Sequence, residues 1–430
     1  MSGILYSQDS SGFTDLEILK KRGPDDFKEE TNPLGYFACS VLNILDSGIK
    51  HLKKTKSGIL LYNGSTKSNN DKNAFSENLD DSLNNTIDFV KDLCGSYALI
   101  YVTERHVVFG VDHFESKNLW FYHDQNTRTL TIASVPNIIK QKHKTAWKAL
   151  ENKIYTVDRK DFSIKIQTNR FFDLTQKTNN FDLVFEKFES AVKDSYYPDQ
   201  STSLLSSGMD CGVINCGLHK IFGKVDCLAD PQKEVIGVLN DRVHLHGAKL
   251  LPNPQGHHIE KEKIFNDVLP NNEVWDLHMT NPVINLIKNG VKKRNKKIVV
   301  VGNGGDELYN DRQGQMHGFS FTKTNGLFPA SLELVWPWHN HHARLRLMLI
   351  RFDLTSGYFG VEANNPLTDV GLVQAWLNTT QKLKNEYKLW MKEYMLQEKY
   401  PFTTQKIHSF NPKYAPEKWK IVNDKIHLHS

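Results

Sequence analysis

Over the first 170 residues, apolar and polar positions alternate in short runs that predict β-strands. The runs are rich in β-branched and aromatic residues, and Gly, Asn, Asp and Ser bound them. They cover residues 35–45, 57–64, 95–104, 106–112, 118–123 and 129–134. A helix is predicted within residues 78–93, where Leu79, Leu83, Ile87 and Val90 recur at helical spacing. This part of the chain is therefore predicted to consist mainly of strands and turns.

The pattern changes after residue 170, where helices and apolar runs alternate. Residues 171–196 contain a predicted helix, with an apolar face formed by Leu183, Phe185, Phe188 and Val192. Strand-like runs follow at residues 202–206, 224–229, 249–253 and 297–303. Residues 299–301 are continuously apolar, as in a strand buried on both faces. The alternation predicts an α/β domain with a doubly wound parallel sheet and ligands at the carboxyl ends of its strands.

Composition agrees with two globular domains, which we place at residues 1–170 and 171–430. The chain has 430 residues and a net charge of +5, with basic and acidic residues interleaved. We therefore expect no nucleic-acid partner. Five scattered cysteines are too few for a disulfide scaffold and lack a zinc spacing. Without a leader pattern or a run of about 18 apolar residues, we expect a cytoplasmic protein with no membrane contact.

The turn after the run at 202–206 has the character of a phosphate-binding loop. Small residues at Ser206, Ser207 and Gly208 let backbone N–H groups point inward, ahead of a predicted helix. Asp210 adds a negative charge, which fits beside phosphate when Mg²⁺ binds both. From these residues alone, a plain polar turn between a strand and a helix remains the alternative.

A second glycine-rich turn follows the apolar run at 299–301. Gly302, Gly304 and Gly305 lead directly into the adjacent acids Asp306 and Glu307. Such a turn is a candidate for a second phosphate and Mg²⁺ position. The alternative is a turn followed by an acidic first helical turn, which suits the helix dipole.

Together these turns resemble the synthase domain of asparagine synthetases, which belongs to the pyrophosphate-loop ATP pyrophosphatases. Residues 206–211 follow the family pattern Ser-Gly-Gly-x-Asp-Ser, with Ser207 and Cys211 as departures. Residues 302–307 follow Gly-Glu-Gly-x-Asp-Glu, with Asn303 as the departure. Residues 351–369 align without a gap on a third family segment, and depart from it at Asn364 and at residues 367–368.

This resemblance implies ATP and Mg²⁺ as cofactors and assigns residues to roles. The nucleotide-binding residues would be Leu205, Ser206, Ser207, Gly208, Asp210, Cys211, Gly302, Gly304 and Gly305. Asp210 and Asp306 would bind the metal; Asp306, Glu307 and Lys406 would be catalytic; Arg351, Glu362 and Asp369 would bind substrate. From the residues alone, an alternative role for Arg351, Glu362 and Asp369 stays open, namely salt bridges that pack helices together. For Lys406 the alternative is an ordinary surface lysine.

The N-terminal region resembles the class II glutaminase domain of the same family, carried by residues 22–26, 62–65, 93–101 and 110–122. The resemblance implies an N-terminal-nucleophile fold, with two antiparallel sheets sandwiched between helices. Its degenerate glutaminase site would comprise Ser2, Asn63, Gly64 and Asp112. Ser2 replaces the catalytic cysteine, and a hydroxyl is much harder to deprotonate than a thiol.

Other family positions in this region have also changed. The segment at 38–42 lacks the arginine that holds the glutamine carboxylate, and Ser65 replaces an acid. Val111 replaces a second arginine, and Glu115 replaces a glycine. We therefore expect that glutaminase activity has been lost.

The resulting expectation is an ATP-dependent carbon–nitrogen ligase. It would adenylate a carboxylate, the aspartate side chain by resemblance, release pyrophosphate, and form an amide with ammonia or another amine. A homodimer is compatible with the resemblance. Two alternatives stay open: a β-lactam-forming or peptide-cyclising relative that uses an internal amine, and a non-catalytic pseudoenzyme.

Overall fold

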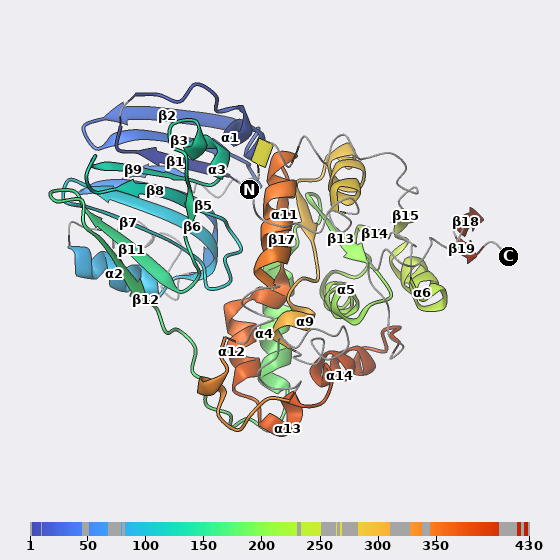
Figure 1. Cartoon of the computed structure of the whole chain (residues 1–430). Coiled ribbons are helices and arrows are strands. Elements are labelled where there is room, and N and C mark those ends of the chain that lie inside the picture. Colours follow the sequence, from blue (N-terminus) through green and yellow to red (C-terminus); the bar gives the residue numbers. More distant parts are fainter. Residues whose placement is uncertain are drawn as a thin grey trace. The chain divides into compact units, whose positions relative to one another are not determined.

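A computed structural model describes most of the chain as two compact units (Figure 1). The described residues are 2–9, 11–44, 51–67, 79, 82–229, 234–250, 264, 267–268, 283–309, 327–337, 345–403, 419–422 and 425–428. Unit 1 comprises Met1–Phe171, Ile259–Val274 and Leu349–Glu362; unit 2 comprises Phe172–His258, Trp275–Met348 and Ala363–Ser430. Within the described ranges, no helix has the length and apolar character that a membrane span requires.

Unit 1 contains two antiparallel sheets of six strands each. The first has the order β10-β8-β9-β1-β3-β2: Trp147–Lys148, Trp120–Asp124, Thr129–Ala133, Gly3–Ser7, Gly35–Val41 and Asp26–Asn32. The second has the order β12-β11-β7-β6-β5-β4: Ile164–Thr168, Lys153–Asp158, His106–Val111, Cys94–Thr103, Gly58–Lys67 and Leu52–Lys54. The six strands predicted here from the pattern are all confirmed, with boundaries shifted by a few residues.

The inner faces of the two sheets form one hydrophobic core. Ile4, Phe37 and Ile132 of the first sheet cluster with residues of the second that include Ile100 and Phe109. Such interdigitation of alternate residues is typical of a β-sandwich. On the outside, α2 (Leu83–Lys91) packs on the second sheet, while α1 (Glu17–Arg22) and α3 (Pro136–Lys140) pack on the first. The expected sandwich between helices is confirmed.

Unit 2 is built on a five-stranded sheet with the order β15-β14-β13-β16-β17. These strands are Lys249–Leu250, Cys227–Ala229, Ser201–Leu205, Ile298–Val300 and Glu362–Asn364, and the pairs formed by β13, β14, β15 and β16 are parallel. From the central β13, the chain adds β14 and β15 on one side and β16 and β17 on the other. This reversal of direction confirms a doubly wound sheet and makes β13 and β16 the switch point.

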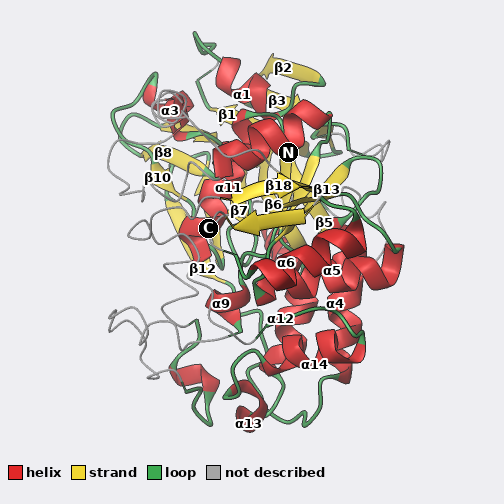
Figure 2. Cartoon of the chain, turned by 90° about the vertical axis from the view of Figure 1, so that its right-hand side faces the viewer, coloured by secondary structure: helices red, strands yellow, loops and turns green. Residues whose placement is uncertain are grey.

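Helices and short turns complete the described part of unit 2. The α-helices are α4 (Asp182–Ser195), α5 (Met209–Phe222), α6 (Ile236–His246), α9 (Gly305–Leu308), α12 (Val370–Leu377), α13 (Gln381–Lys384) and α14 (Leu389–Gln397), while α11 (Arg346–Tyr358) begins in this unit and continues into unit 1. Other helical turns are η1 (Leu286–Val291), η2 (Lys292–Arg294), η3 (Leu332–Leu334) and η5 (Pro366–Thr368), and β18 (Trp419–Val422) pairs with β19 (Lys425–Leu428). Helices α4, α5, α12 and α14 lie together in both views (Figures 1 and 2).

The predicted apolar face of α4 needs one correction. Leu183 is 43% exposed, whereas Val184, Phe188, Ala191 and Val192 are buried. The buried residues are spaced at four and three positions and share one helix face, which leaves Leu183 on the neighbouring face. The Phe188 ring packs edge-on against two aromatic rings of α14, so this face joins α4 to α14.

Candidate functional site

The two predicted phosphate loops lie side by side at the switch point of the unit 2 sheet. Residues 206–208 follow β13, and residues 301–304 follow β16. Parallel pairing of β13 with β16 places their carboxyl ends at the same edge. Helix α5 then begins at Met209 and α9 at Gly305, so Asp210 and Asp306 occupy the first turns of two neighbouring helices.

A lysine that the sequence did not single out joins these two acids. Lys388 Nζ lies 2.5 Å from Asp210 Oδ1 and 2.5 Å from Asp306 Oδ1, and its side chain is 3% exposed. Burial raises the pKa of Asp210 to about 6, with Lys388 opposing and Asp306 adding to the rise. Burial lowers the pKa of Lys388, but the two carboxylates outweigh it and hold that pKa above its ordinary value. One ammonium is thus shared between two acids.

The glycines of the second loop make room for this arrangement. A Cβ at Gly305 would lie 2.2 Å from Asp210 Cγ, and one at Gly302 would lie 2.9 Å from the backbone nitrogen of Cys211. Gly304 has a φ of +103°, which side chains of L-residues rarely allow. Any other residue at 305 would displace Asp210, so these glycines let the two loops approach each other.

Glu307 has a different role from its neighbour Asp306. Its Oε2 accepts a hydrogen bond from the Gly304 backbone nitrogen at 3.2 Å and closes the start of α9. This hydrogen bond shows that Glu307 caps the start of α9. Its catalytic role stays a prediction.

The first loop is held by two residues that the sequence analysis missed. The Ser207 backbone nitrogen donates to Glu234 Oε2 at 2.6 Å, and the Ser207 hydroxyl donates to the same oxygen. The buried Arg242 donates to the carbonyls of Ser206 and of Gly208, the latter at 2.9 Å. Arg242 lies in α6, and Glu234 lies two residues before that helix. Neither residue belongs to a recognisable sequence motif.

Asp210 and Asp306 fit the ligand preferences of Mg²⁺. Asp210 Oδ1 and Asp306 Oδ1 each lie 2.5 Å from Lys388 Nζ, so these two oxygens are at most twice that distance apart and are close enough to bind one ion. Across the described ranges, no cluster of three or more His, Cys, Asp or Glu residues could hold a metal. A magnesium ion here would therefore complete its coordination with phosphate oxygens and water, as Mg²⁺ usually does.

The three predicted substrate-binding residues are divided between the units. Arg351 and Glu362 belong to unit 1, and Asp369 belongs to unit 2. Glu362 accepts a hydrogen bond from the buried Lys117; burial alone would raise its pKa, but this ammonium contributes to lowering it to about 2. Asp369 accepts from the Leu372 nitrogen at 3.0 Å and caps α12. Their contacts with a substrate stay a prediction, as does the role of Lys406, which lies outside the described residues.

In unit 1, Ser2 is 1% exposed and sits beside a histidine. Its backbone nitrogen donates to Asn63 Oδ1 at 2.9 Å, and its hydroxyl lies 3.2 Å from His51 Nε2. His51 Nδ1 lies 2.9 Å from the carbonyl of Tyr62, which fixes the ring. Gly64 has a φ of +125°, and a Cβ there would lie 2.0 Å from a carbonyl oxygen. Ser2, Asn63 and Gly64 are thus brought together.

Asp112 instead organises the turn that follows β7. Its carboxylate accepts backbone hydrogen bonds from Tyr97, Phe114, Ser116 and Lys117 at 3.0 to 3.2 Å. Burial raises its pKa, although these bonds act to lower it. In the same turn, Glu115 has a φ of +59° and pairs with Lys148 at 3.0 Å. A positive φ is uncommon for a residue with a side chain and favours glycine, so Glu115 holds a strained position in this turn.

No protein-family model matches the chain, and no curated protein matches it. Among solved structures, it is similar to the glutamine phosphoribosylpyrophosphate amidotransferase from B. subtilis complexed with ADP and GMP, at 10% identity and a TM-score of 0.29, covering 51% of this chain and 64% of that one. A structure of the allosteric regulatory enzyme of purine biosynthesis matches at 10% identity and a TM-score of 0.28, covering 64% of this chain and 78% of that one.

A third structure, the U34-tRNA thiolase NcsA from Methanococcus maripaludis with its 4Fe-4S cluster, matches at 10% identity and a TM-score of 0.22, covering 53% of this chain and 83% of that one. The chain thus spans less than two thirds of the B. subtilis amidotransferase.

Proposed function

We propose that this chain is an ATP-dependent ligase that adenylates a carboxylate and converts it to an amide. The observation that carries the proposal is the convergence of Asp210 and Asp306 on Lys388 at the carboxyl ends of β13 and β16. Two acids beside two glycine-containing loops suit a metal-bound polyphosphate better than an uncharged ligand. The motif resemblance supports the aspartate side chain as the carboxylate.

The residues of the chain would divide the work by position and charge. Backbone N–H groups of residues 206–208 and the start of α5, a helix of 14 residues, would orient the phosphates. Asp210 and Asp306 would hold Mg²⁺, which supplies positive charge against the phosphate oxygens. Lys388, fixed between the acids, would donate to phosphate oxygens as charge builds up at the α-phosphorus.

The chemistry then takes two displacements. An oxygen of the substrate carboxylate attacks the α-phosphorus, the bond to the β-phosphate breaks, and pyrophosphate leaves. The resulting acyl-adenylate is attacked at its carbonyl carbon by an amine, and AMP leaves as the amide forms. Holding the reacting groups in place supplies much of the rate enhancement in such steps.

The amine would be ammonia from solution or from another protein, because we expect the glutaminase site to be inactive. This expectation is tested by measuring glutamate release from glutamine. Release above background by the wild type, abolished by Ser2→Ala, would contradict it.

The proposal is tested by pyrophosphate exchange into ATP with a panel of carboxylates, followed by mass spectrometry of the products with added amines. Exchange should depend on aspartate and disappear in Asp210→Asn. The matched control is Asp199→Asn, because Asp199 is an exposed acid of the same unit. Exchange that persists in Asp210→Asn would contradict the metal role. A cyclised product without added amine would favour the internal-amine alternative.

One observation favours a second candidate, a non-catalytic protein. Glu234 occupies the backbone nitrogen and hydroxyl of Ser207, two donors that a phosphate would otherwise use. If Glu234 keeps this position, the loop is closed to nucleotide. ATP binding that appears in Glu234→Ala and is absent from the wild type would support this candidate; equal binding by both proteins would exclude it.

A further inference from the structure

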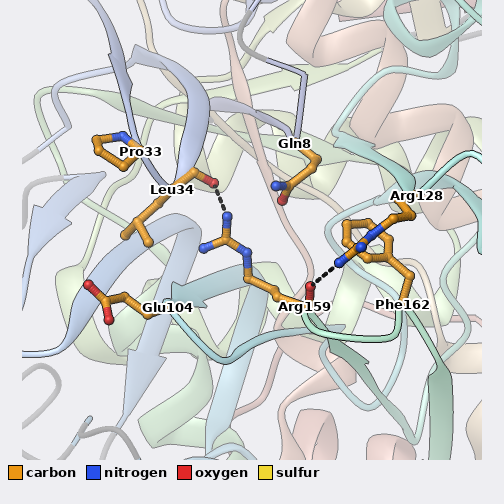
Figure 3. A pocket seen from close by; sticks show the side chains of 7 residues that line it. All are labelled: Gln8, Pro33, Leu34, Glu104, Arg128, Arg159 and Phe162. Atoms are coloured by element: carbon orange, nitrogen blue, oxygen red, sulfur yellow. Dashed lines mark hydrogen bonds between the residues drawn. The ribbon is translucent and has the colours of Figure 1, made fainter.

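A cavity of about 470 Å³ opens at the surface of unit 1, far in the sequence from the residues of the phosphate loops (Figure 3). Its lining includes Gln8, Leu34, Arg128, Arg159 and Phe162. A cavity of this size falls in the range of small-molecule sites, about 300–1,000 Å³. Two arginines dominate its charge.

Arg159 is held rigidly but is not neutralised. Its Nη1 donates to the carbonyl of Thr103 at 2.8 Å and its Nη2 to the carbonyl of Leu34 at 3.1 Å. Its Nε is buried without a hydrogen-bond partner. A guanidinium carries five N–H donors, so each Nη keeps a second hydrogen for another acceptor. The carbonyls fix the geometry and leave the positive charge in place.

Arg128 adds a second positive charge at the same cavity. Its Nη2 donates to the carbonyls of Lys160 at 2.7 Å and Arg159 at 3.3 Å, and its guanidinium lies 5.3 Å from the ring centroid of Phe162. In the part of the chain that the structure describes, no carboxylate lies within 4.0 Å of either guanidinium. Two guanidiniums that line one cavity, each held by backbone carbonyls, favour an anion.

Gln8 supplies a neutral donor opposite Arg159. Its Oε1 accepts a hydrogen bond from the Tyr6 hydroxyl at 2.7 Å, so its NH₂ group remains available as a donor. The Gln8 amide and the Arg159 guanidinium point toward one another across the cavity in Figure 3. Glu104, the acid in the lining, is exposed and works against binding of an anion.

We propose that this cavity is a binding site for a small molecule that carries a phosphate or carboxylate group. Its oxygens would accept hydrogen bonds from Arg159 and from the Gln8 amide, and Arg128 would supply further charge. The site shares no residue with the nucleotide loops, so it does not depend on the proposed ligase activity.

The test is calorimetric titration of the full chain at low ionic strength and without Mg²⁺, using pyrophosphate and citrate as probes. Arg128→Met should weaken binding several-fold, since it removes one of the two positive charges that line the cavity. Glu104→Gln should strengthen binding several-fold. The matched control Arg170→Met removes an exposed arginine of the same unit and should change nothing.

Arg159→Met removes two backbone hydrogen bonds and can lower stability, so Arg159→Lys, which keeps the charge, is measured beside it. Binding of pyrophosphate alone would identify a phosphate ligand, and binding of citrate alone a carboxylate ligand. Binding that is unchanged in both Arg128→Met and Glu104→Gln, or no binding of either probe by the wild type, would overturn the proposal.

Discussion

Lys388 Nζ lies 2.5 Å from Asp210 Oδ1, and this contact joins residues 178 positions apart in the chain. The same ammonium reaches Asp306, so one positive charge serves two acids that burial has partly removed from water. The cluster keeps a net negative charge, which a bound divalent cation would neutralise. The ion pair therefore both assembles the site and leaves it attractive to Mg²⁺.

Lys388→Met should destabilise unit 2 in a way that Mg²⁺ reverses. Removing one partner of a buried ion pair typically costs about 3–5 kcal/mol, because the remaining charge is left uncompensated. Mg²⁺ should restore part of this loss by binding both acids. Urea unfolding with and without millimolar Mg²⁺ measures the effect.

The control for Lys388 is Lys392→Met, which removes a lysine one helical turn further along α14. It should show a small loss and no dependence on Mg²⁺. If the stability of Lys388→Met is the same with and without Mg²⁺, the two acids do not form a cation site.

The Lys117–Glu362 pair predicts a structural rather than a binding role for Glu362. Both side chains are buried. Lys117→Met should cost about 3–5 kcal/mol, and the double variant with Glu362→Leu should recover much of that cost. Burial raises the pKa of Glu362, but Lys117 and a further cation hold it at about 2, below its ordinary 4.5, so the contribution of the ionised carboxylate to stability is full above pH 4.5 and is lost as pH falls toward 2.

Acid unfolding of Lys117→Met and the wild type, followed by circular dichroism, checks this prediction. The stability difference should shrink between pH 4.5 and 2. A Glu362→Gln protein that unfolds like the wild type but loses pyrophosphate exchange would instead support the substrate-binding prediction.

The sequence was sufficient for elements whose pattern is local. Alternation located the strands of the sandwich, and the continuous apolar run at 299–301 located β16 with its buried residues. The two glycine-containing turns pointed to Asp210 and Asp306, because an acid directly after such a turn suits a metal ion that also binds phosphate.

Long-range partners could not be read in the same way. Lys388 lies among Lys384 and Lys392 in the sequence, and nothing local distinguishes it from them. Its contact depends on how the chain before α14 meets two strand ends that are encoded far upstream. Glu234 and Arg242 were missed for the same reason, since their partners are backbone atoms of a distant loop.

Lys384 predicts a pH dependence of stability. Its side chain is buried, and Nζ donates to the carbonyl of Thr379 and lies 5.4 Å from the centroid of the Trp376 ring. Burial lowers the pKa of Lys384 from 10.5 to about 7. The unfolded chain therefore binds more protons between pH 7 and 10.5, so this residue's contribution to stability grows as pH rises through that window and is lost as pH falls to 7.

Urea unfolding at pH 6.5 and pH 9.5 measures the Lys384 effect. Relative to Lys384→Met, the wild type should gain stability at the higher pH. Lys382→Met, an exposed lysine of the same short helix, serves as the control and should show no such gain. Parallel pH profiles for wild type and Lys384→Met would contradict the lowered pKa.

Gly305→Ala should disable the candidate site through geometry alone. A Cβ at residue 305 would lie 2.2 Å from Asp210 Cγ, so the carboxylate must move away from Lys388 and Asp306. Overpacking of this kind costs about 1–3 kcal/mol. We expect a loss of stability in that range and a larger loss of pyrophosphate exchange than the stability change explains. Gly237→Ala is the matched control, because a Cβ at residue 237 would meet no atom within 4 Å other than those of its chain neighbours and its own helix backbone. Full exchange activity in Gly305→Ala would show that Asp210 does not act from the position seen here.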